Sequence, residues 1–170
     1  ARAIRQRCPG CRVELLIPDL QGDQQALQTI LDSRPDVLGH NLETVPRLYQ
    51  AARSGAVYQR SLQLLAAANR IAPEVPTKSG LMLGMGETIE EILDVMQDLR
   101  RSGCAMLTLG QYLQPTRDHL PIDRYVEPAE FEQLRQSGLE LGFEHVEAGP
   151  LVRSSYHAAE QFEGDQDDES

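Results

Sequence analysis

Short apolar runs alternate with amphipathic stretches along most of the chain. The apolar runs predict buried strands over residues 13–20, 36–40, 76–83 and 106–113. The stretches between and after them have helical spacing, which predicts helices over 23–32, 45–53, 57–71, 89–101 and 129–141. Strands that alternate with helices in this way favour a parallel sheet with helical crossovers, so the expected fold class is α/β.

The helix over 89–101 has the clearest boundaries. Thr88 and Glu91 form a T-x-x-E capping box, in which each side chain accepts a hydrogen bond from a backbone amide at the helix start. Apolar residues then recur at helical spacing, and Gly103 can adopt the left-handed conformation that ends a helix. The apolar stripe of this helix is therefore expected to face the core.

The number of strands limits the architecture. A closed parallel barrel needs about six or eight strands. The pattern yields four, and residues 1–7 have the pattern of a helix end whose own strand is missing. We therefore predict one domain that forms part of a TIM-type barrel, with about four strand–helix units. A natural four-unit fold or a small open sheet is the alternative.

The composition is that of an ordinary globular protein, with 41% hydrophobic and 25% charged residues among 170. Six of the 26 acidic residues fall within 160–170, so the remainder carries 20 acids and 16 bases, a net charge of −4 where the whole chain has −10. Such an acidic stretch predicts a disordered tail. Basic residues do not cluster, which argues against nucleic-acid binding. The apolar runs are too short to span a membrane and no leader pattern opens the chain, so we expect a cytoplasmic or organelle-matrix protein.

The three cysteines are an odd set, which argues against a secreted disulfide framework. Cys8 and Cys11 have the spacing of a redox motif, but the Pro-Gly pair between them is typical of a turn. One such pair cannot fill the four ligand positions of a zinc ion or an iron–sulfur cluster. The favoured interpretation is a turn that carries two thiols.

Polar residues follow all four predicted strands. They are Asp19 after the first, Asn41 and Glu43 after the second, Glu87 after the third, and Gln111 and Gln114 at the end of the fourth. Ligands of parallel sheets bind where the carboxyl ends of the strands meet. The sequence therefore predicts a shared site at this edge, although each residue alone would be interpreted as a cap or turn residue.

Three segments carry a family resemblance: 78–87 (KSGLMLGMGE), 110–115 (GQYLQP) and 153–158 (RSSYHA). Together they are similar to the C-terminal half of the lipoyl synthases, a family of radical S-adenosylmethionine enzymes with two [4Fe–4S] clusters. The resemblance extends from Val13 to about Ala158. It implies that residues 1–150 are the C-terminal part of a (β/α)6 radical SAM barrel, that 151–159 hold a cluster-ligand segment, and that 160–170 are the disordered tail.

Gly80, Met82, Gly84 and Glu87 have the spacing of the pattern G-x-I-x-G-x-x-E, with Met82 at the isoleucine position. In radical SAM enzymes this pattern places backbone against the adenine. Glycines permit the close approach, and the apolar side chain packs on a flat ring. A tight strand-to-helix turn would require similar glycines.

Residues 40–44 (HNLET) resemble a segment of lipoyl and biotin synthases in which an asparagine and an acidic residue bind the ribose and methionine parts of the cofactor. The amide of Asn41 can donate and accept, and the carboxylate of Glu43 accepts. Thr44 followed by Pro46 would otherwise indicate a helix N-cap, and His40 is expected in the core. The residues that the resemblance implies for S-adenosylmethionine are Asn41, Glu43, Gly80, Met82, Gly84, Gln111 and Tyr112.

Two basic residues are candidates for substrate binding. Lys78 is the only lysine beside 15 arginines, and it lies in a strand that the pattern predicts to be buried. Arg60 has the charge to face a carboxylate, although a solvated helix position is the simpler interpretation.

The segment 153–158 implies a metal ligand. In lipoyl synthases a serine of this segment completes the coordination of the auxiliary cluster beside three cysteines, and the match favours Ser155 over Ser154. A metal must lower the pKa of serine before it binds as alkoxide, so serine is a weak ligand. Weak coordination suits a cluster that is dismantled to release sulfur. A polar turn is the alternative.

The resemblance implies the following reaction for the complete enzyme. S-adenosylmethionine is cleaved at one [4Fe–4S] cluster, and the 5′-deoxyadenosyl radical removes hydrogen from carbons 6 and 8 of an octanoyl group. That group is attached to a lipoyl carrier domain or to the glycine cleavage H protein, and the second cluster supplies two sulfurs. Ferredoxin or flavodoxin would donate the electrons.

The chain departs from the family in one respect. The three-cysteine motif of the radical cluster and the auxiliary cysteine motif are absent from these 170 residues. Three cysteines cannot ligate two four-iron clusters, so this chain alone is expected to bind no radical-initiating cluster. The alternative function is a non-catalytic remnant that binds a nucleotide or a lipoyl carrier domain.

Overall fold

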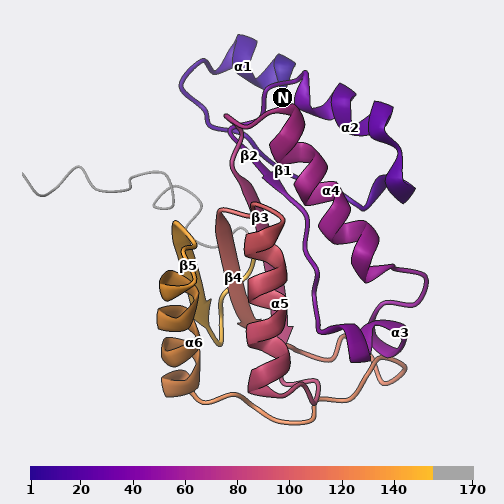
Figure 1. The fold of residues 1–170 in the computed structure, drawn as a ribbon, viewed down its shortest axis with the longest axis vertical. Coiled ribbons are helices and arrows are strands. Elements are labelled where there is room, and N and C mark those ends of the chain that lie inside the picture. Colours follow the sequence, from indigo (N-terminus) through magenta and orange to yellow (C-terminus); the bar gives the residue numbers. More distant parts are fainter. Residues whose placement is uncertain (155–170) are drawn as a thin grey trace, which may run out of the picture.

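The computed structural model describes residues 1–154 as a parallel sheet with helices packed against one face (Figure 1). The strands lie side by side in chain order: β1 (Glu14–Leu16), β2 (Val37–Gly39), β3 (Thr77–Leu83), β4 (Met106–Gln111) and β5 (His145–Gly149). Every neighbouring pair is parallel. Within the described residues the sheet is open at β1 and β5, as expected for part of a barrel.

Helical segments connect the strands. The α-helices are α1 (Arg2–Arg7), α2 (Gln24–Leu31), α3 (Tyr49–Ala52), α4 (Tyr58–Ile71), α5 (Ile89–Arg101) and α6 (Pro128–Glu140). Two short 3₁₀ helices are η1 (Leu20–Gly22) and η2 (Pro46–Leu48). Residues 45–53 were predicted as one helix but divide into η2 and α3. The N-cap residue of η2 is Val45 and not Thr44, and its side chain forms no capping hydrogen bond.

The fifth strand was not predicted. Its sequence, HVEAG, buries only Val146 fully, so it lacks the apolar run by which the other strands were recognised. His145 and Glu147 lie on the opposite face, where the two side chains contact each other at 3.0 Å. The four predicted strand–helix units are present, and β5 follows them as an additional strand. It was missed because an alternating strand gives a weak signal when it is only five residues long.

Alternate residues of β3 and β4 divide between two faces, as side chains of a strand must. Leu81, Leu83, Leu107 and Leu109 join the main core with α4, α5 and α6. The residues between them, among which are Gly80, Met82 and Thr108, face away from these helices. The strands are thus held from the helical side, and their other face is left to form a site.

The turn from β3 into α5 is fixed by polar contacts. Thr88 and Glu91 form the predicted capping box, and Gly103 ends the helix region with a φ of +80°. Arg47 donates to both carboxylate oxygens of Glu91 and to the carbonyl of Gly86. The end of β3 is therefore tied to the segment that follows β2.

Candidate functional site

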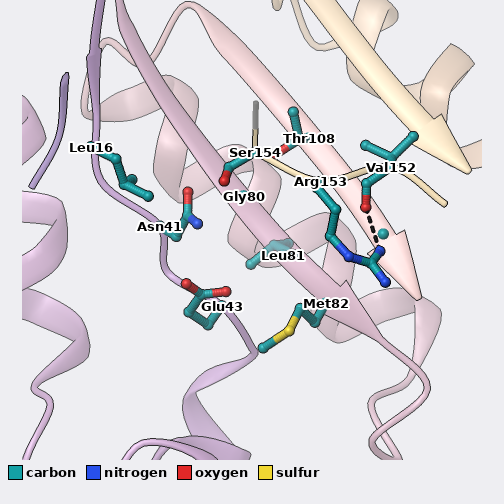
Figure 2. A pocket seen from close by; sticks show the side chains of 11 residues that line it. Leu16, Asn41, Glu43, Gly80, Leu81, Met82, Thr108, Val152, Arg153 and Ser154 are labelled. Atoms are coloured by element: carbon teal, nitrogen blue, oxygen red, sulfur yellow. Dashed lines mark hydrogen bonds between the residues drawn. The ribbon is translucent and has the colours of Figure 1, made fainter. Parts of the chain in front are cut away.

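A cavity of ≈ 270 Å³ lies on the uncovered face of the sheet, toward the carboxyl ends of the strands (Figure 2). Leu16 of β1, Asn41 and Glu43 line one side. Gly80, Leu81 and Met82 of β3 form the middle, with Thr108 and Gly110 of β4 beside them. Residues 152–154 complete the lining. Of the six polar residues predicted to share a site at this edge, Asn41 and Glu43 line the cavity, whereas the other four do not: Asp19, Glu87, Gln111 and Gln114.

Gly80 lies at a point of the wall where there is no room for a side chain. A Cβ atom at this position would lie 2.7 Å from the Oγ1 of Thr108 and 3.1 Å from the Oδ1 of Asn41. Both distances are shorter than ordinary contacts. The glycine therefore lets the side chains of Asn41 and Thr108 converge beside the backbone of β3.

Glu43 is fastened to β3 although it lies beyond the end of β2. Its amide donates to the carbonyl of Gly80 at 2.9 Å, and its carbonyl accepts from the amide of Met82 at 2.8 Å. The residue adopts a φ of +70°, which is uncommon for a residue with a side chain. Such strain persists only where the surroundings enforce it, and it is concentrated at functional sites.

The carboxylate of Glu43 has a mixed electrostatic environment. Burial raises its pKa above the usual range, while a hydrogen bond with the Asn41 side chain and the charge of Arg53 oppose the rise. Asn41 and Glu43 thus provide an amide and a carboxylate in one cavity. This pair can recognise hydroxyl or ammonium groups of a ligand.

The glycine motif of β3 divides into two halves. Gly80 and Met82 line the cavity, whereas Gly84 turns away from it with a φ of +98°. The buried carboxylate of Glu87 accepts from the amides of Gly84 at 2.5 Å and Met85 at 2.9 Å. The second half therefore builds the turn into α5, so the pattern combines the binding and the turn interpretations.

Gln111 and Tyr112 do not line this cavity. The Gln111 side chain donates to the carbonyl of Arg124 at 3.1 Å and accepts from the amide of Val126 at 2.9 Å. The Tyr112 hydroxyl donates to the carbonyl of Leu120 at 2.8 Å. Both side chains hold the segment 120–126 against the end of β4, and this segment in turn packs on Gly84.

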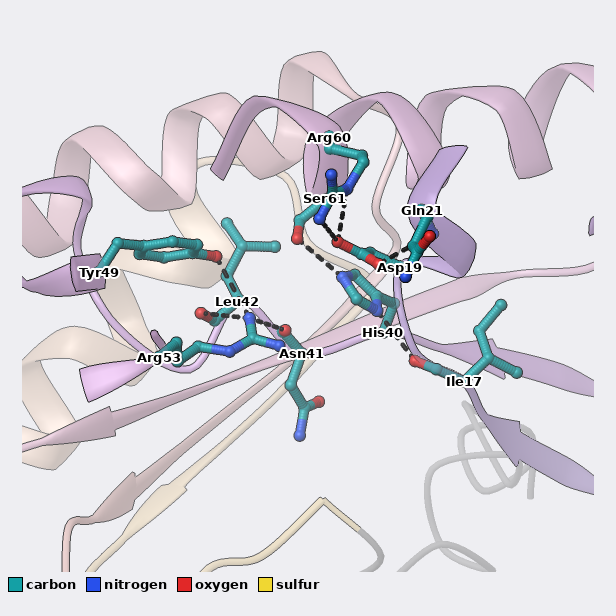
Figure 3. Close-up of polar contacts among 10 residues, drawn as sticks. All are labelled: Ile17, Asp19, Gln21, His40, Asn41, Leu42, Tyr49, Arg53, Arg60 and Ser61. Atoms are coloured by element: carbon teal, nitrogen blue, oxygen red, sulfur yellow. Dashed lines mark hydrogen bonds and ion pairs between the residues drawn. The ribbon is translucent and has the colours of Figure 1, made fainter. Parts of the chain in front are cut away.

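The two substrate-binding candidates form ion pairs. Lys78 is buried on β3 and contacts Glu14 of β1 at 3.2 Å. Glu14 reaches it across β2 because Gly39 lies between them without a side chain. Arg60 of α4 pairs with Asp19 at 2.6 Å (Figure 3). Neither residue lines the cavity, although Lys78 precedes Gly80 by two positions on the same face of the strand.

His40 is a core residue, as predicted. Its Nδ1 lies 2.9 Å from the carbonyl of Ile17 and its Nε2 lies 2.9 Å from the Oγ of Ser61 (Figure 3). Desolvation lowers its pKa. Both ring nitrogens are therefore occupied.

The predicted metal ligand Ser155 falls outside the described residues, as do residues 156–159 of the predicted cluster-ligand segment and the tail 160–170. The chain that leads to it is described. Val152, Arg153 and Ser154 line the cavity, and the carbonyl of Val152 lies so close to Gly110 that a Cβ there would collide with it. The glycine of β4 thus fixes the approach of this segment.

The cysteines do not converge. Cys8 and Cys11 are exposed, and the amide of Cys11 donates to the carbonyl of Cys8 at 3.0 Å, which closes the predicted turn. Cys104 is fully buried, and burial raises its pKa to about 12. Within residues 1–154, no three side chains of His, Cys, Asp or Glu are grouped so as to hold a metal ion. Over the same residues, no helix is both long and apolar enough to cross a membrane.

Some residues of the site were not predicted. Arg153 and Ser154 belong to a recognised motif but were not assigned to this cavity, and Thr108 and Gly110 follow from the pairing of β4 with β3. Arg53 is a different case. Its side chain donates to the backbone carbonyls of Asn41 and Leu42, which lie 12 and 11 residues earlier in the chain. Hydrogen bonds to backbone carbonyls do not depend on the side chains at those positions, so no sequence pattern indicates them.

The family model for the radical SAM superfamily matches residues 1–99. The chain belongs to the radical SAM superfamily. Among curated relatives, the lipoyl synthase of Rubrobacter xylanophilus is 57% identical over 162 residues, which cover 95% of this chain and 50% of that protein. The lipoyl synthase of Acidithiobacillus ferrooxidans is 58% identical over 161 residues, covering 94% and 51%. The chain therefore spans about half the length of these relatives.

A solved structure has a similar fold. Methylornithine synthase superposes with a TM-score of 0.66 at 15% identity, over 99% of this chain and 56% of that one. At this identity the likeness concerns the fold alone. It agrees with a five-stranded part of a parallel barrel.

Proposed function

We propose that the cavity binds S-adenosylmethionine through Asn41, Glu43, Gly80 and Met82. One observation carries the proposal: two segments about 40 residues apart, each with a cofactor-binding pattern, meet in a single cavity and are joined by the hydrogen bond from Glu43 to Gly80. The bare backbone at Gly80 fits a flat ring, and the amide and carboxylate fit hydroxyl and ammonium groups.

In this proposal the residues of the chain bind and orient the cofactor. Gly80 and Met82 contact the adenine, while Asn41 and Glu43 fix the ribose and the methionine part. Leu16 and Val152 contribute apolar side chains to the lining around it. When bound, and given one electron by a reduced [4Fe–4S] cluster held from outside residues 1–154, the cofactor would supply a 5′-deoxyadenosyl radical, with methionine as the other product.

The structure suggests different roles for three of the residues implied by the resemblance. Gly84, Gln111 and Tyr112 fasten the 120–126 segment to the strand ends and leave the cavity to their neighbours. We therefore propose that they support the cofactor site without contacting the cofactor. Variants of Gln111 are then expected to lose stability before they lose affinity.

We further propose that the whole protein is a lipoyl synthase, which inserts two sulfur atoms into a carrier-bound octanoyl group. Identities of 57% and 58% to lipoyl synthases over almost the whole chain support this. The substrate would be an octanoylated lipoyl domain or H protein, with a ferredoxin or flavodoxin as electron donor.

The described residues do not fit an iron–sulfur cluster, because two cysteines are exposed at a turn and the third is buried with a raised pKa. The protein ligands of two clusters would therefore have to come from outside residues 1–154. Ser155 remains our candidate for an oxygen ligand of the auxiliary cluster. Ser154, which lines the cavity, would be its neighbour.

The experiment compares this chain with a protein that carries it together with the cysteine motifs of the family. After anaerobic reconstitution, iron, 5′-deoxyadenosine and lipoyl product are measured separately in both. We expect all three from the longer protein and neither iron nor product from the chain alone. A longer protein that forms 5′-deoxyadenosine without lipoyl product would contradict the lipoyl synthase proposal. If the longer protein binds S-adenosylhomocysteine but forms no 5′-deoxyadenosine, a non-catalytic binding module would be favoured.

A further inference from the structure

Arg53 lies at the C-terminal end of α3 and reaches back to the loop that follows β2 (Figure 3). Its Nη1 donates to the carbonyl of Asn41 at 3.0 Å and to the carbonyl of Leu42 at 3.1 Å. The same nitrogen lies 3.4 Å from the hydroxyl of Tyr49, and the guanidinium carbon lies 5.6 Å from the Tyr49 ring centre. One side chain thus bridges two successive carbonyls of the cofactor loop.

The loop needs such a partner because it leaves regular strand pairing there. His40 and Glu43 still donate to β3, through the carbonyls of Lys78 and Gly80. The two carbonyls between them lie on the side of Arg53. A buried carbonyl without a hydrogen-bond partner is destabilising, because it loses its hydrogen bonds to water and gains none in the fold. The contact therefore stabilises the path by which the chain enters the left-handed conformation of Glu43.

The charge of Arg53 is not neutralised by a direct ion pair. Within residues 1–154, no carboxylate lies within ion-pair distance of it, whereas its neighbour Arg60 is paired with Asp19. The positive charge of Arg53 lowers the pKa of Glu43 and so opposes the effect of burial on that carboxyl group. The same charge lowers the pKa of His40. Among the described residues, the other charged or titratable groups near Glu43 are Tyr49 on the α3 side and Arg153 across the cavity.

We propose that Arg53 is a positioning residue of the cofactor site: it holds the loop 41–43 in the conformation that presents Asn41 and Glu43 to the cavity, and it supplies the positive charge opposite the Glu43 carboxylate. This inference rests on the proposed cofactor site. It assigns to Arg53 no contact with the cofactor. Its two contributions, hydrogen bonding and charge, are separable by substitution.

Three variants of the full chain separate them. Arg53→Lys keeps the charge and loses the planar fork, Arg53→Gln keeps an amide donor and loses the charge, and Arg53→Met loses both. Arg135→Gln is the matched control, since Arg135 belongs to an ion pair with Glu132 on α6, away from the cavity. Circular dichroism and urea unfolding identify the variants that remain folded.

The first measurement is the titration of the Glu43 carboxyl carbon by NMR, with its signal assigned through Glu43→Gln. In Arg53→Gln and Arg53→Met we expect the Glu43 titration midpoint to move upward by several tenths of a unit. Arg53→Lys and Arg135→Gln should leave it nearly unchanged. An unchanged midpoint in Arg53→Met would overturn the electrostatic part.

The second measurement is calorimetric binding of S-adenosylhomocysteine between pH 5 and 8. We expect the affinity at pH 7 to fall about tenfold in Arg53→Met. Binding should weaken as the pH falls and Glu43 becomes protonated. This weakening should begin at a higher pH in Arg53→Gln than in the unsubstituted chain, but not in Arg53→Lys. Wild-type affinity in a folded Arg53→Met would overturn the positioning role. Failure of the unsubstituted chain to bind at any pH would overturn the cofactor site itself, and is distinguishable because it does not depend on Arg53.

Discussion

The amide of Glu43 donates to the carbonyl of Gly80 at 2.9 Å, so the loop after β2 and the glycine motif of β3 share one stretch of backbone pairing. The two cofactor-binding patterns are therefore held in a fixed register by the fold. Side-chain substitutions can remove a contact with a ligand, but they cannot easily change this register. The following predictions use that distinction.

Gly80→Ala should weaken binding of S-adenosylhomocysteine while leaving the fold intact. The added methyl group meets Thr108 and Asn41 at 2.7 and 3.1 Å, so these side chains must shift within the cavity. We expect a loss of about 1–2 kcal/mol in binding free energy, measured by calorimetry. Gly10→Ala is the control, because no atom lies within 4 Å of its added methyl group. Equal affinities in the two variants would contradict the proposed role of Gly80.

Glu43→Gln should raise the free energy of unfolding at neutral pH. Burial raises the pKa of Glu43, so the unfolded chain releases this proton at lower pH than the folded one. The free energy of unfolding therefore falls as the pH rises from the pKa of Glu43 in the unfolded chain to its pKa in the folded chain. Above the folded pKa, the destabilisation caused by the buried carboxylate is complete. The advantage of the glutamine variant should shrink toward pH 4. Urea unfolding across pH checks this, with exposed Glu90→Gln as the control; a gain that does not vary with pH would contradict it.

Glu87→Ala should destabilise the chain by about 2–3 kcal/mol, because a buried carboxylate accepts from two backbone amides that would lose their partner. The midpoint of urea unfolding measures this. Glu90→Ala, at an exposed position of the same region, should change stability by less than about 0.5 kcal/mol. If both variants unfold alike, the turn does not depend on Glu87.

Lys78→Met should cost about 3–5 kcal/mol, because it leaves the Glu14 carboxylate without its partner in a mostly buried position. Adding Glu14→Met should restore most of that stability. The double variant also tests the predicted substrate role. Normal lipoyl product from a stable double variant of the longer protein would show that Lys78 serves only the sheet.

Ser155→Ala in the longer protein should abolish lipoyl product while 5′-deoxyadenosine formation continues. The reason is the proposed role of its hydroxyl as a ligand needed for sulfur insertion and not for cofactor cleavage. Ser154→Ala is the matched control and should retain most of the product. Both products are quantified by mass spectrometry after anaerobic turnover. The opposite order of effects would assign the ligand to Ser154.

The local fold was predictable wherever a periodic signal was strong. The helix starting at Thr88 and its capping box were confirmed, as were the strands that contain Gly80 and Leu107. The strand β5 was missed because HVEAG buries a single large apolar residue. Its position became evident only through pairing with β4, a contact between distant parts of the chain.

The cavity was predictable in part for the same reason. Strand ends placed Asn41, Glu43 and Met82 on one edge, and the structure brings their segments together. Whether a side chain at that edge lines the cavity also depends on which loop segment packs against it, and the sequence pattern does not indicate this. Gln111 was assigned to this edge by its position and to the cofactor by the resemblance, yet its side-chain amide forms hydrogen bonds with the backbone of the 120–126 segment.

The three thiols differ enough in accessibility to be distinguished by chemistry alone. Cys104 is fully buried with a pKa raised to about 12, while Cys8 and Cys11 are exposed in the turn between α1 and β1. A maleimide or a spin label at neutral pH should therefore modify that turn and spare the core. The natural sequence thus provides two attachment points for spectroscopic probes in the turn before β1, without a cysteine having to be introduced or removed.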